Sequence, residues 1–519
     1  MNYKPATPKD AAAVILLNDA GDKVLWAQRN PQLAFLGGYH AFPGGKLETS
    51  DALVKIENCA GEDLKKFIAC AVRETFEETG VLLVRNGDKL TKGQRASIHD
   101  DLISGRMTFA EILQHWNLWI DANDFYYTGF WTTPQFSPVR FKTRFFLAVC
   151  PPKQAPYAAI TELQNVEFVE PADALNRWKK SEVLISPPVL LSLKTLNEFS
   201  QQRHRDTEKN PQSEIHNPKS RRLCGEKLLN NSQKLDGEIR FIELNPRVVC
   251  FPLRTQTLPP ATHTNCFIVG RKKFIVIDAA SKDESEQAAL HRLVDSFVER
   301  NFICQAIITT HLHQDHFGGE TILQAHLKEK YGLEVPIAAH RSTAESLAGK
   351  INVQKFTADA ETYNLEDENG SNFELQILHT PGHARGHLAF YDEEFGFLLS
   401  GDNVINSGSV VIAPPEGDMK TYLESLERMK NLPNLRFLCG SHGAAVPNAK
   451  GKIEEYIVHR LEREKQILEA LQNGAKAARE IVERIYVGLK PELFKLAEKS
   501  VEAHLEKIKN DESAGEKSA

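Results

Sequence analysis

The sequence lacks the features that mark membrane, secreted and strongly basic proteins. No apolar run approaches the roughly 20 residues needed to cross a membrane. Residues 1–5 are not followed by the apolar core of a signal peptide, and none of the 8 cysteines forms a C-x-x-C pair. We therefore expect reduced thiols, a cytoplasmic location and no membrane partner. The net charge of −6 gives no global reason to bind nucleic acid or an anionic membrane.

A chain of 519 residues is too long for one hydrophobic core, so we expect several domains. Apolar runs at 11–17 and 23–28 predict an opening hairpin. From 198 to 236 the sequence is polar and without periodicity, which predicts a linker, and its basic residues leave a contact with RNA open. The predicted domains are 1–197, 237–447 and 448–519 with a disordered tail, separated by the linker 198–236.

Three carboxylates share one face of a helix predicted around residues 71–81. Glu74, Glu77 and Glu78 stand at positions i, i+3 and i+4, opposite an apolar stripe. Like charges at this spacing destabilise an isolated helix, and a divalent cation between them would remove the repulsion. Hard carboxylate oxygens suit Mg²⁺ or Mn²⁺. A solvated acidic face without metal remains the alternative.

Residues 41–48 and 71–81 together resemble the Nudix box. Gly45 begins the box, Arg73 precedes the carboxylates, and Gly80 closes it. In two departures from the pattern, Asp51 replaces the first Glu and an insertion separates Asp51 from Arg73. Residues 130–146 are similar to the Nudix branch that includes coenzyme A diphosphatases.

The Nudix resemblance implies an α/β/α sandwich that hydrolyses a nucleoside diphosphate linked to another group. It implies that Glu74, Glu77 and Glu78 hold Mg²⁺ or Mn²⁺, with Glu74 and Glu78 as candidate catalytic residues. Arg73 would anchor the carboxylates by charge-assisted hydrogen bonds. The departures from the box leave open whether this site turns substrate over.

The densest group of metal-binding side chains lies in residues 310–319. His311, His313, Asp315 and His316 fall within six residues, and imidazole and carboxylate are ligands for zinc, iron and manganese. A strand is predicted at 303–309 and a helix from 319 to about 331, which places the motif at the carboxyl end of a strand. A His-rich surface loop is the alternative.

Further candidate ligands each follow a predicted strand. They are His383, Asp402 and His442, and Asp278 ends another strand at the same expected sheet edge. A lone histidine at a strand end is more often a hydrogen-bonded structural residue. Four strand ends that converge on one edge would supply seven nitrogen and oxygen ligands, enough for two metals.

This arrangement resembles the metallo-β-lactamase fold, an αββα sandwich. The resemblance implies two Zn²⁺ ions, or Fe or Mn, with Asp402 bridging them and Asp278 supporting the first loop. It assigns one metal to His311, His313 and His383, and the other to Asp315, His316 and His442. The cysteine ligand of zinc β-lactamases is missing, since Asp402 stands in its place, which disfavours antibiotic hydrolysis. His387 is expected to be a supporting residue and not a ligand.

Two metals that share a water would lower its pKa to about 7 and make metal-bound hydroxide available at neutral pH. This hydroxide would attack a carbonyl or phosphoryl centre of an ester, thioester or phosphodiester. Asp315 could pass the proton onward.

Helices are predicted at 452–472, 480–487 and 491–509. With residues 414–419 and 459–468, they resemble the winged-helix-like C-terminal extension of the β-lactamase-like-protein-2 group. No strand pair is predicted in the polar residues that follow, so we expect no wing, and the helices could simply cap the core.

The fold class predicted is thus α/β multidomain, with a Nudix sandwich, a metallo-β-lactamase sandwich and a small helical domain. The leading function is a bifunctional metal-dependent hydrolase, which cleaves a nucleoside diphosphate derivative at one site and an ester, thioester or phosphodiester at the other. The expected substrates are small molecules. The alternative is a single-stranded RNA endoribonuclease whose Nudix module senses a nucleotide without catalysis. A homodimer remains open.

Overall fold

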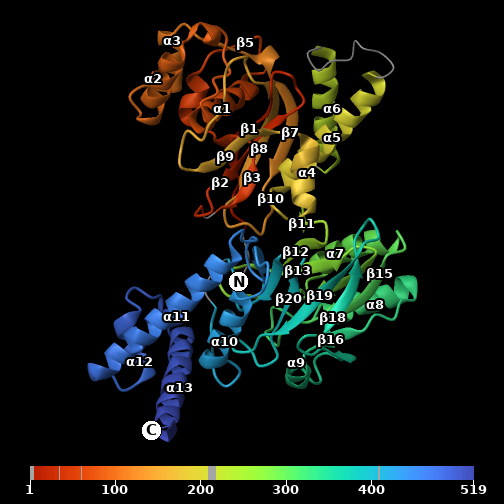
Figure 1. Ribbon diagram of the computed structural model, residues 1–519, viewed down its shortest axis with the longest axis vertical. Coiled ribbons are helices and arrows are strands. Elements are labelled where there is room, and N and C mark those ends of the chain that lie inside the picture. Colours follow the sequence, from red (N-terminus) through yellow and green to blue (C-terminus); the bar gives the residue numbers. More distant parts are fainter. Residues whose placement is uncertain are drawn as a thin grey trace. The chain divides into compact units, whose positions relative to one another are not determined.

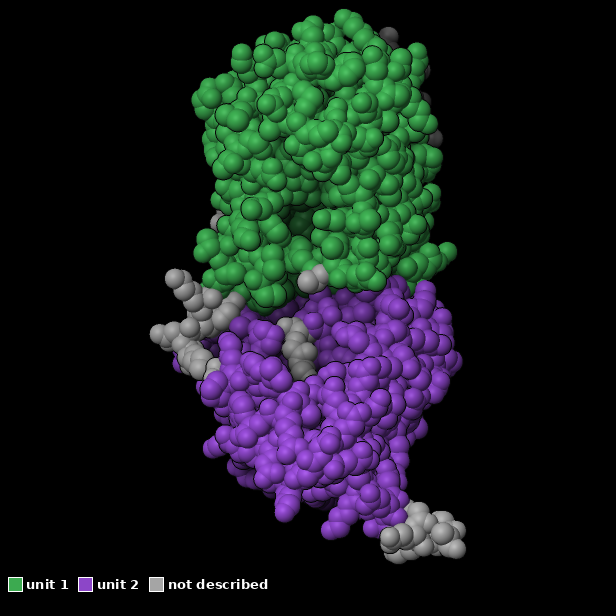
Figure 2. All heavy atoms as spheres, turned by 90° about the vertical axis from the view of Figure 1, so that its left-hand side faces the viewer, with its two compact units in different colours: residues 1–242 green, residues 243–519 purple. Residues whose placement is uncertain are grey.

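The computed structural model describes residues 5–33, 35–59, 61–207, 218–235, 237–406 and 410–518. The chain divides into two compact units, Met1–Ile242 (unit 1) and Glu243–Ala519 (unit 2), which Figure 2 shows in different colours. No helix among the described residues is long and apolar enough to span a membrane.

Unit 1 is built on an eight-stranded sheet with the order β10-β3-β2-β1-β8-β7, in which β4 pairs with β1 and β9 with β2. The predicted opening hairpin is confirmed, because β1 and β2 pair antiparallel with Leu17 opposite Val24. The strands of the sheet are β1 (Lys9–Leu17), β2 (Val24–Arg29), β3 (Tyr39–Ala41), β4 (Gly44–Lys46), β7 (Tyr126–Thr132), β8 (Phe141–Val149), β9 (Leu163–Val169) and β10 (Leu184–Ile185). A separate two-stranded pair is β5 (Ile56–Glu57) and β6 (Ile120–Asp121).

Strand β1 is apolar on both faces because helices cover both sides of the sheet. Ala12, Val14 and Leu16 face the core that includes α1, whereas Ala13 and Ile15 face the core that includes α4 and α5 (Figure 1). The helices are α1 (Glu62–Thr79), α2 (Lys92–Ile103), α3 (Phe109–His115), α4 (Pro171–Lys179), α5 (Pro187–Thr207) and α6 (Pro218–Lys234). The predicted α/β/α sandwich is confirmed.

The region expected to be a polar linker differs from that expectation. Helix α5 continues to Thr207, α6 follows from Pro218, and residues 208–217 lie outside the described residues. In α6, Cys224 and Leu228 are buried in the core of unit 1. The Ser232 hydroxyl donates to the carbonyl oxygen of Phe130 in β7 at 2.8 Å. Few apolar residues anchor this helix, which is why its composition resembled a linker.

Unit 2 is built on a twelve-stranded sheet with the order β11-β12-β13-β14-β18-β19-β20-β21-β22, and β15, β16 and β17 extend from β14. The strands are β11 (Ile242–Asn245), β12 (Val248–Arg254), β13 (His263–Gly270), β14 (Lys273–Ile277), β15 (Ile303–Ile308), β16 (Ile337–Ala339), β17 (Lys355–Phe356), β18 (Thr362–Glu366), β19 (Asn372–His379), β20 (Leu388–Asp392), β21 (Phe397–Gly401) and β22 (Phe437–Gly440).

Two large apolar cores support this sheet. One packs β12, β13 and β14 against α7 (Glu284–Val298) and α8 (Glu320–Tyr331). The other packs β20, β21 and β22 against α10 (Met419–Lys430) and α11 (Ala449–Gln472) (Figure 1). Helix α9 (Arg341–Ser346) follows β16. Helices on both sides agree with the predicted αββα sandwich.

The C-terminal part of unit 2 is helical. Helix α11 is followed by α12 (Ala478–Ile485) and α13 (Phe494–Ser518), which share a small core around Ile467, Ile481 and Val501. The described residues 449–518 contain no strand, so this part of the chain has no wing.

The strand ends bring the predicted site residues together. Strands β14 and β15 run parallel with Ile277 opposite Ile308, so Asp278 and the loop 309–319 emerge at one edge of the sheet. Strands β21 and β22 are also parallel, and they end just before Asp402 and His442.

Candidate metal centre and carboxylate site

Asp278 fixes the loop that carries the histidine motif. Its φ angle of 55° turns its carboxylate back toward the next strand end. The backbone N–H of Thr310 donates to Oδ1 and its hydroxyl donates to Oδ2, both at 2.8 Å. Nδ1 of His316 lies 2.8 Å from the same Oδ2. Asp278 therefore orients both ends of the loop, a geometry that fits the supporting role predicted for it. No sequence pattern predicted the part played by Thr310.

The predicted ligands gather in two overlapping sets of donor atoms. In the part of the chain that the structure describes, donors within 4.8 Å of one another come from His311, His313 and His383, from Asp315, His316 and His442, and from His311, His316 and Asp402. We call the first of these sets group 1 and the second group 2. They have the composition that the sequence resemblance implied for the two metals.

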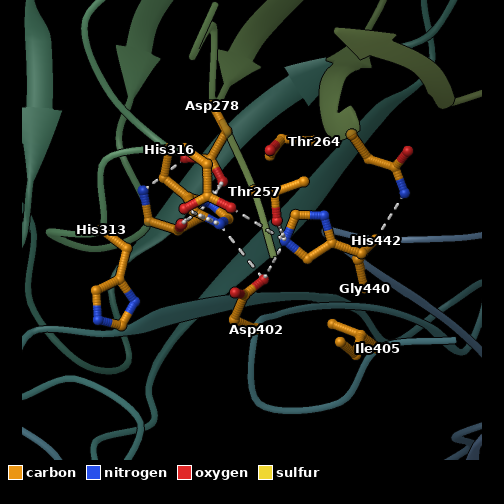
Figure 3. Close-up of polar contacts among 12 residues, drawn as sticks. Thr257, Thr264, Asp278, His313, His316, Asp402, Ile405, Gly440 and His442 are labelled. Carbon is orange, nitrogen blue, oxygen red and sulfur yellow. Dashed lines mark hydrogen bonds and ion pairs between the residues drawn. The ribbon is translucent and has the colours of Figure 1, made fainter. Parts of the chain in front are cut away.

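Asp402 lies between the two groups and directs one carboxylate oxygen to each. Figure 3 shows its contacts with His316 and His442 of group 2. Its Oδ2 is 4.0 Å from Nε2 of His311 and 3.7 Å from Nε2 of His383, both in group 1. Its Oδ1 is 3.4 Å from Nε2 of His316 and 3.5 Å from Nε2 of His442, both in group 2. One carboxylate thus connects the groups.

Hydrogen bonds on the outer side of the rings turn Nε2 toward the centre. Nδ1 of His383 donates to the carbonyl oxygen of Val411 at 2.9 Å, and Nδ1 of His442 donates to that of His263 at 2.8 Å. A carbonyl only accepts, so Nδ1 carries a hydrogen, and Nε2 is the nitrogen that is left to bind a cation when the ring is neutral. Sequence reasoning could not find these partners, because they are backbone atoms.

Three inward atoms of the centre are buried without a hydrogen-bond partner among the described residues. They are Nε2 of His316, Nε2 of His383 and Oδ1 of Asp402. A buried polar atom without a partner costs roughly 1–3 kcal/mol. Divalent cations in the two groups would satisfy all three, so the residues present fit the metals that the fold implies.

His387 has both ring nitrogens engaged by the chain. Its Nε2 accepts from the backbone N–H of Asp402 at 3.0 Å, and its Nδ1 lies 2.9 Å from the hydroxyl of Thr380. A Cβ at Gly401 would come within 2.4 Å of Nε2 of His387, and the φ of Gly401 is +54°. Glycine is therefore required there for His387 to hold the backbone of Asp402.

The two groups differ in charge. Burial and the neighbouring imidazoles lower the pKa of His311 well below its usual range, and burial with the charge of His313 lowers the pKa of His383 to about 3. Burial also opposes a charge on His442, but the carboxylates of Asp402 and Asp315 raise its pKa to about 10. Group 1 thus presents neutral imidazoles, whereas group 2 holds a proton that a cation would displace.

In unit 1, Arg73 organises the predicted carboxylate site. Its guanidinium is buried and binds Asp51 through Nε at 2.8 Å and Nη2 at 3.0 Å. Its Nη1 donates to Oε1 of Glu74 and Oε2 of Glu77, each at 3.0 Å. Asp51, the unexpected residue in the box, is 1% exposed and serves as the partner of Arg73.

Glu78 points to the other side of the site, where its Oε2 accepts the backbone N–H of Gly44 at 2.8 Å. A Cβ at Gly45 would lie 2.5 Å from the carboxylate carbon of Glu74, so only glycine admits this approach. The three glutamates do not form one of the close donor sets found among the described residues. Arg73 holds Glu74 and Glu77, whereas the backbone of Gly44 holds Glu78.

Burial raises the pKa of Glu74 to about 7 and that of Glu78 to about 8. Both carboxyl groups have a higher pKa in the folded chain than the value of about 4.3 that applies to the unfolded chain. Their protonated forms therefore stabilise the folded chain fully below about pH 4.3, and this contribution is lost as the pH rises through 7 and 8. In metal-free buffer, raising the pH from about 5 to about 8.5 is therefore expected to destabilise unit 1 by a few kcal/mol. Mg²⁺ should reverse the loss, because it replaces the protons.

Tryptophan fluorescence in the intact chain measures this effect. The 5 tryptophans are Trp26, Trp116, Trp119, Trp131 and Trp178, all in unit 1. Glu78→Gln should flatten the pH dependence and remove most of the response to Mg²⁺. The exposed Glu62 on the same helix offers the control, and Glu62→Gln should behave like the wild type. An unchanged pH profile in Glu78→Gln would contradict the role of burial at this carboxylate.

Three family models match the chain. They are the metallo-beta-lactamase superfamily at residues 259–442, the NUDT19 Nudix domain at 54–196 and the beta-lactamase associated winged helix domain at 477–518. The chain is 30% identical over 261 residues to a beta-lactamase-like protein 2 homolog of Drosophila melanogaster. The alignment covers 48% of this chain and 82% of that protein.

Two further proteins are similar over part of the chain. An atrochrysone carboxyl ACP thioesterase of Pseudocercospora fijiensis is 28% identical, with 43% of this chain and 62% of that protein covered. The crystal structure of a NUDIX hydrolase from Alicyclobacillus acidocaldarius is 29% identical, with 37% of this chain and 92% of that chain covered and a TM-score of 0.33.

The chain belongs to the metallo-β-lactamase superfamily, as a hydrolase of the β-lactamase-like-protein-2 type that carries a Nudix domain in its N-terminal part. Both families generally use divalent metals, in agreement with the histidine and aspartate sets of unit 2.

Proposed function

We propose that unit 2 hydrolyses an acyl thioester or ester at a centre of two divalent cations. His311, His313 and His383 would hold one cation, and Asp315, His316 and His442 the other. The proposal rests on the position of Asp402. One of its carboxylate oxygens faces group 1 and the other faces group 2, at 3.4–4.0 Å from the histidine Nε2 atoms. A carboxylate in this position has no packing function.

Two cations bound there would lower the pKa of a shared water and polarise the substrate carbonyl. The chain itself orients the ligands, since His387 holds the backbone of Asp402 and Asp278 holds the loop of His316. Oδ2 of Asp315 lies 3.4 Å from Nε2 of His442, at a partly exposed edge of the centre. In this proposal, the Asp315 carboxylate would receive the proton that the attacking water gives up.

The thioester is favoured over the phosphodiester for two reasons. One relative is named as a thioesterase that acts on an acyl carrier protein. The sequence of the Nudix half resembles coenzyme A diphosphatases, so one half would cut an acyl group from the carrier and the other would cut the carrier. RNA remains the competing substrate and is included in the test.

For unit 1 we propose hydrolysis of a nucleoside diphosphate derivative, such as coenzyme A, with Mg²⁺ or Mn²⁺ held by Glu74, Glu77 and Glu78. Two observations support this proposal. Gly45 leaves room for the carboxylate of Glu74, and the guanidinium of Arg73 binds the carboxylates of Glu74 and Glu77. Tight nucleotide binding without Mg²⁺-dependent turnover would instead support a sensing module.

The test is metal content and hydrolysis measured on the intact chain and on His313→Ala. The substrates are an acyl-CoA, bis(p-nitrophenyl) phosphate and a single-stranded RNA. The wild type should carry about two transition-metal ions per chain, and the variant should lose one of them and at least about tenfold in the rate of thioester hydrolysis.

The exposed His459 on α11 provides the control, and His459→Ala should match the wild type. Loss of RNA cleavage instead of thioester cleavage in His313→Ala would move the assignment to a nuclease. Full activity in His313→Ala would remove the proposal for unit 2 altogether.

A further inference from the structure

Helix α11 carries two polar side chains that reach the backbone beside the metal centre. Tyr456 and Arg460 stand at positions i and i+4 of the helix, so they lie on one face. The hydroxyl of Tyr456 donates to the carbonyl oxygen of Ile405 at 2.9 Å, and Nη2 of Arg460 donates to that of Val410 at 2.6 Å. Both acceptors follow Asp402 in the chain, so α11 is fastened to the backbone next to this ligand.

Arg460 is buried without a negative partner. Its side chain is 3% exposed, and its Nε has no hydrogen-bond partner among the described residues. No ion pair joins it to a carboxylate in the part of the chain that the structure describes, and its Cζ lies 5.5 Å from the ring centroid of Tyr422. A buried cation without a counterion lowers stability, and an apolar side chain would fill this place at a lower cost. Its contact with Val410 therefore indicates a role beyond packing.

The carbonyl that Arg460 holds is one residue from the carbonyl that orients His383. Nδ1 of His383 donates to the carbonyl oxygen of Val411 at 2.9 Å. Because peptide groups are planar, only the φ and ψ angles of Val411 separate the two carbonyls. The side chains of Val410 and Ile412 on either side are 4% and 0% exposed, so the apolar core holds the flanks of this residue.

We propose that Arg460 is a positioning residue for group 1. By holding the carbonyl of Val410, it fixes the carbonyl of Val411, which sets the ring orientation of His383 and turns Nε2 toward the centre. The outer hydrogen-bond partner of a ligand histidine contributes to metal affinity, and its loss typically weakens binding about 10–100-fold. The helix that begins the C-terminal part thus acts on the metal centre instead of only capping the core. The inference rests on the proposed function, because it assumes that group 1 binds a metal.

The experiment measures the zinc affinity of the full chain by competition with a chromophoric chelator, without reference to activity. Arg460→Met fills the same space without a donor and should weaken one of two bound zinc ions by about tenfold, with the other unchanged. Arg460→Lys is the milder variant. Its ammonium keeps the charge and a donor but reaches less far, so the same ion should bind about threefold more weakly. Circular dichroism checks that both variants are folded.

Arg463, one turn further along α11, provides the matched control. It is half-buried and donates through Nη1 to the carbonyl oxygen of Ile485 in α12 at 3.3 Å. Arg463→Met thus removes an arginine contact with a backbone carbonyl on the same helix, away from the metal centre. It should bind both zinc ions like the wild type.

Four outcomes decide between the explanations. Unchanged zinc affinities in Arg460→Met and Arg460→Lys would overturn the positioning role, and if only the lysine variant folds, its unchanged affinities suffice. An equal weakening of both ions in Arg460→Met would overturn it, because the effect would not be specific to group 1. A similar loss in Arg463→Met would also overturn it, because any damage to α11 would then be enough. A wild-type chain that binds no zinc would overturn the proposed function of unit 2 instead, so the two failures are distinguishable.

Discussion

Replacing Asp402 with alanine is expected to remove both metal ions from unit 2 and to slow thioester hydrolysis by at least about 1000-fold. Each oxygen of this carboxylate faces one donor group, so a single substitution affects both. Without this carboxylate, His316 and His442 lose a counterion, and each donor group loses an oxygen ligand. A loss of about 4 kcal/mol of transition-state stabilisation corresponds to a rate lower by about three powers of ten. Elemental analysis of metal per chain and an acyl-CoA assay measure the two effects.

Asp402→Asn removes the negative charge of the side chain but keeps its shape. The amide keeps one oxygen, so this variant should retain about one metal per chain and an intermediate rate. Circular dichroism would show that both variants remain folded. Two ions per chain with an unchanged rate in Asp402→Ala would contradict the bridging position assigned to this residue.

Replacing Arg73 with methionine is expected to lower the free energy of unfolding of unit 1 by about 3–5 kcal/mol. The substitution leaves Asp51 buried without its partner and removes the donor shared by Glu74 and Glu77. Removing one partner of a buried ion pair lowers the free energy of unfolding, because the remaining charge stays buried away from water without a counterion. Urea unfolding followed by tryptophan fluorescence reports on unit 1 in the intact chain, since all the tryptophans lie there.

Arg85 serves as the control for this substitution, because it is 48% exposed and pairs with Asp124 at 2.7 Å. Arg85→Met should cost less than about 1 kcal/mol, as expected for a surface ion pair. The double variant Asp51→Leu with Arg73→Met should recover part of the stability lost in Arg73→Met, because neither charge is then left alone. Similar unfolding midpoints for Arg73→Met and Arg85→Met would show that the buried pair contributes little.

The sequence predicts that the histidine and aspartate side chains of the two donor groups lie close together, because each of them follows the end of a predicted strand. Apolar runs before Asp278 and His311 predicted two strands, and parallel strands end at one edge of a sheet. The partners of the outer nitrogens of His383 and His442 could not be predicted in this way. They are the carbonyl oxygens of Val411 and His263, and any residue type supplies the same atom.

The fold class was also predictable, whereas two local features were not. The pairing of Arg73 with Asp51 joins residues 22 positions apart, and the sequence showed only that Asp51 departed from the expected pattern. Helix α6 was expected to be part of a polar linker because only a few of its residues, including Cys224 and Leu228, enter the core. A short apolar contact of this kind gives too weak a periodicity to indicate a helix.

The two halves differ in what balances their charges, and this implies different lifetimes of metal binding. Arg73 gives Glu74 and Glu77 a counterion that belongs to the chain, so under the proposed function this carboxylate site would persist without a metal and would take up an ion together with a phosphate-bearing substrate. The buried Nε2 atoms of His316 and His383 have no such substitute among the described residues. Under the proposed function, their centre would be completed by ions that stay bound through many turnovers, so one chain would combine an exchangeable metal site with a resident one.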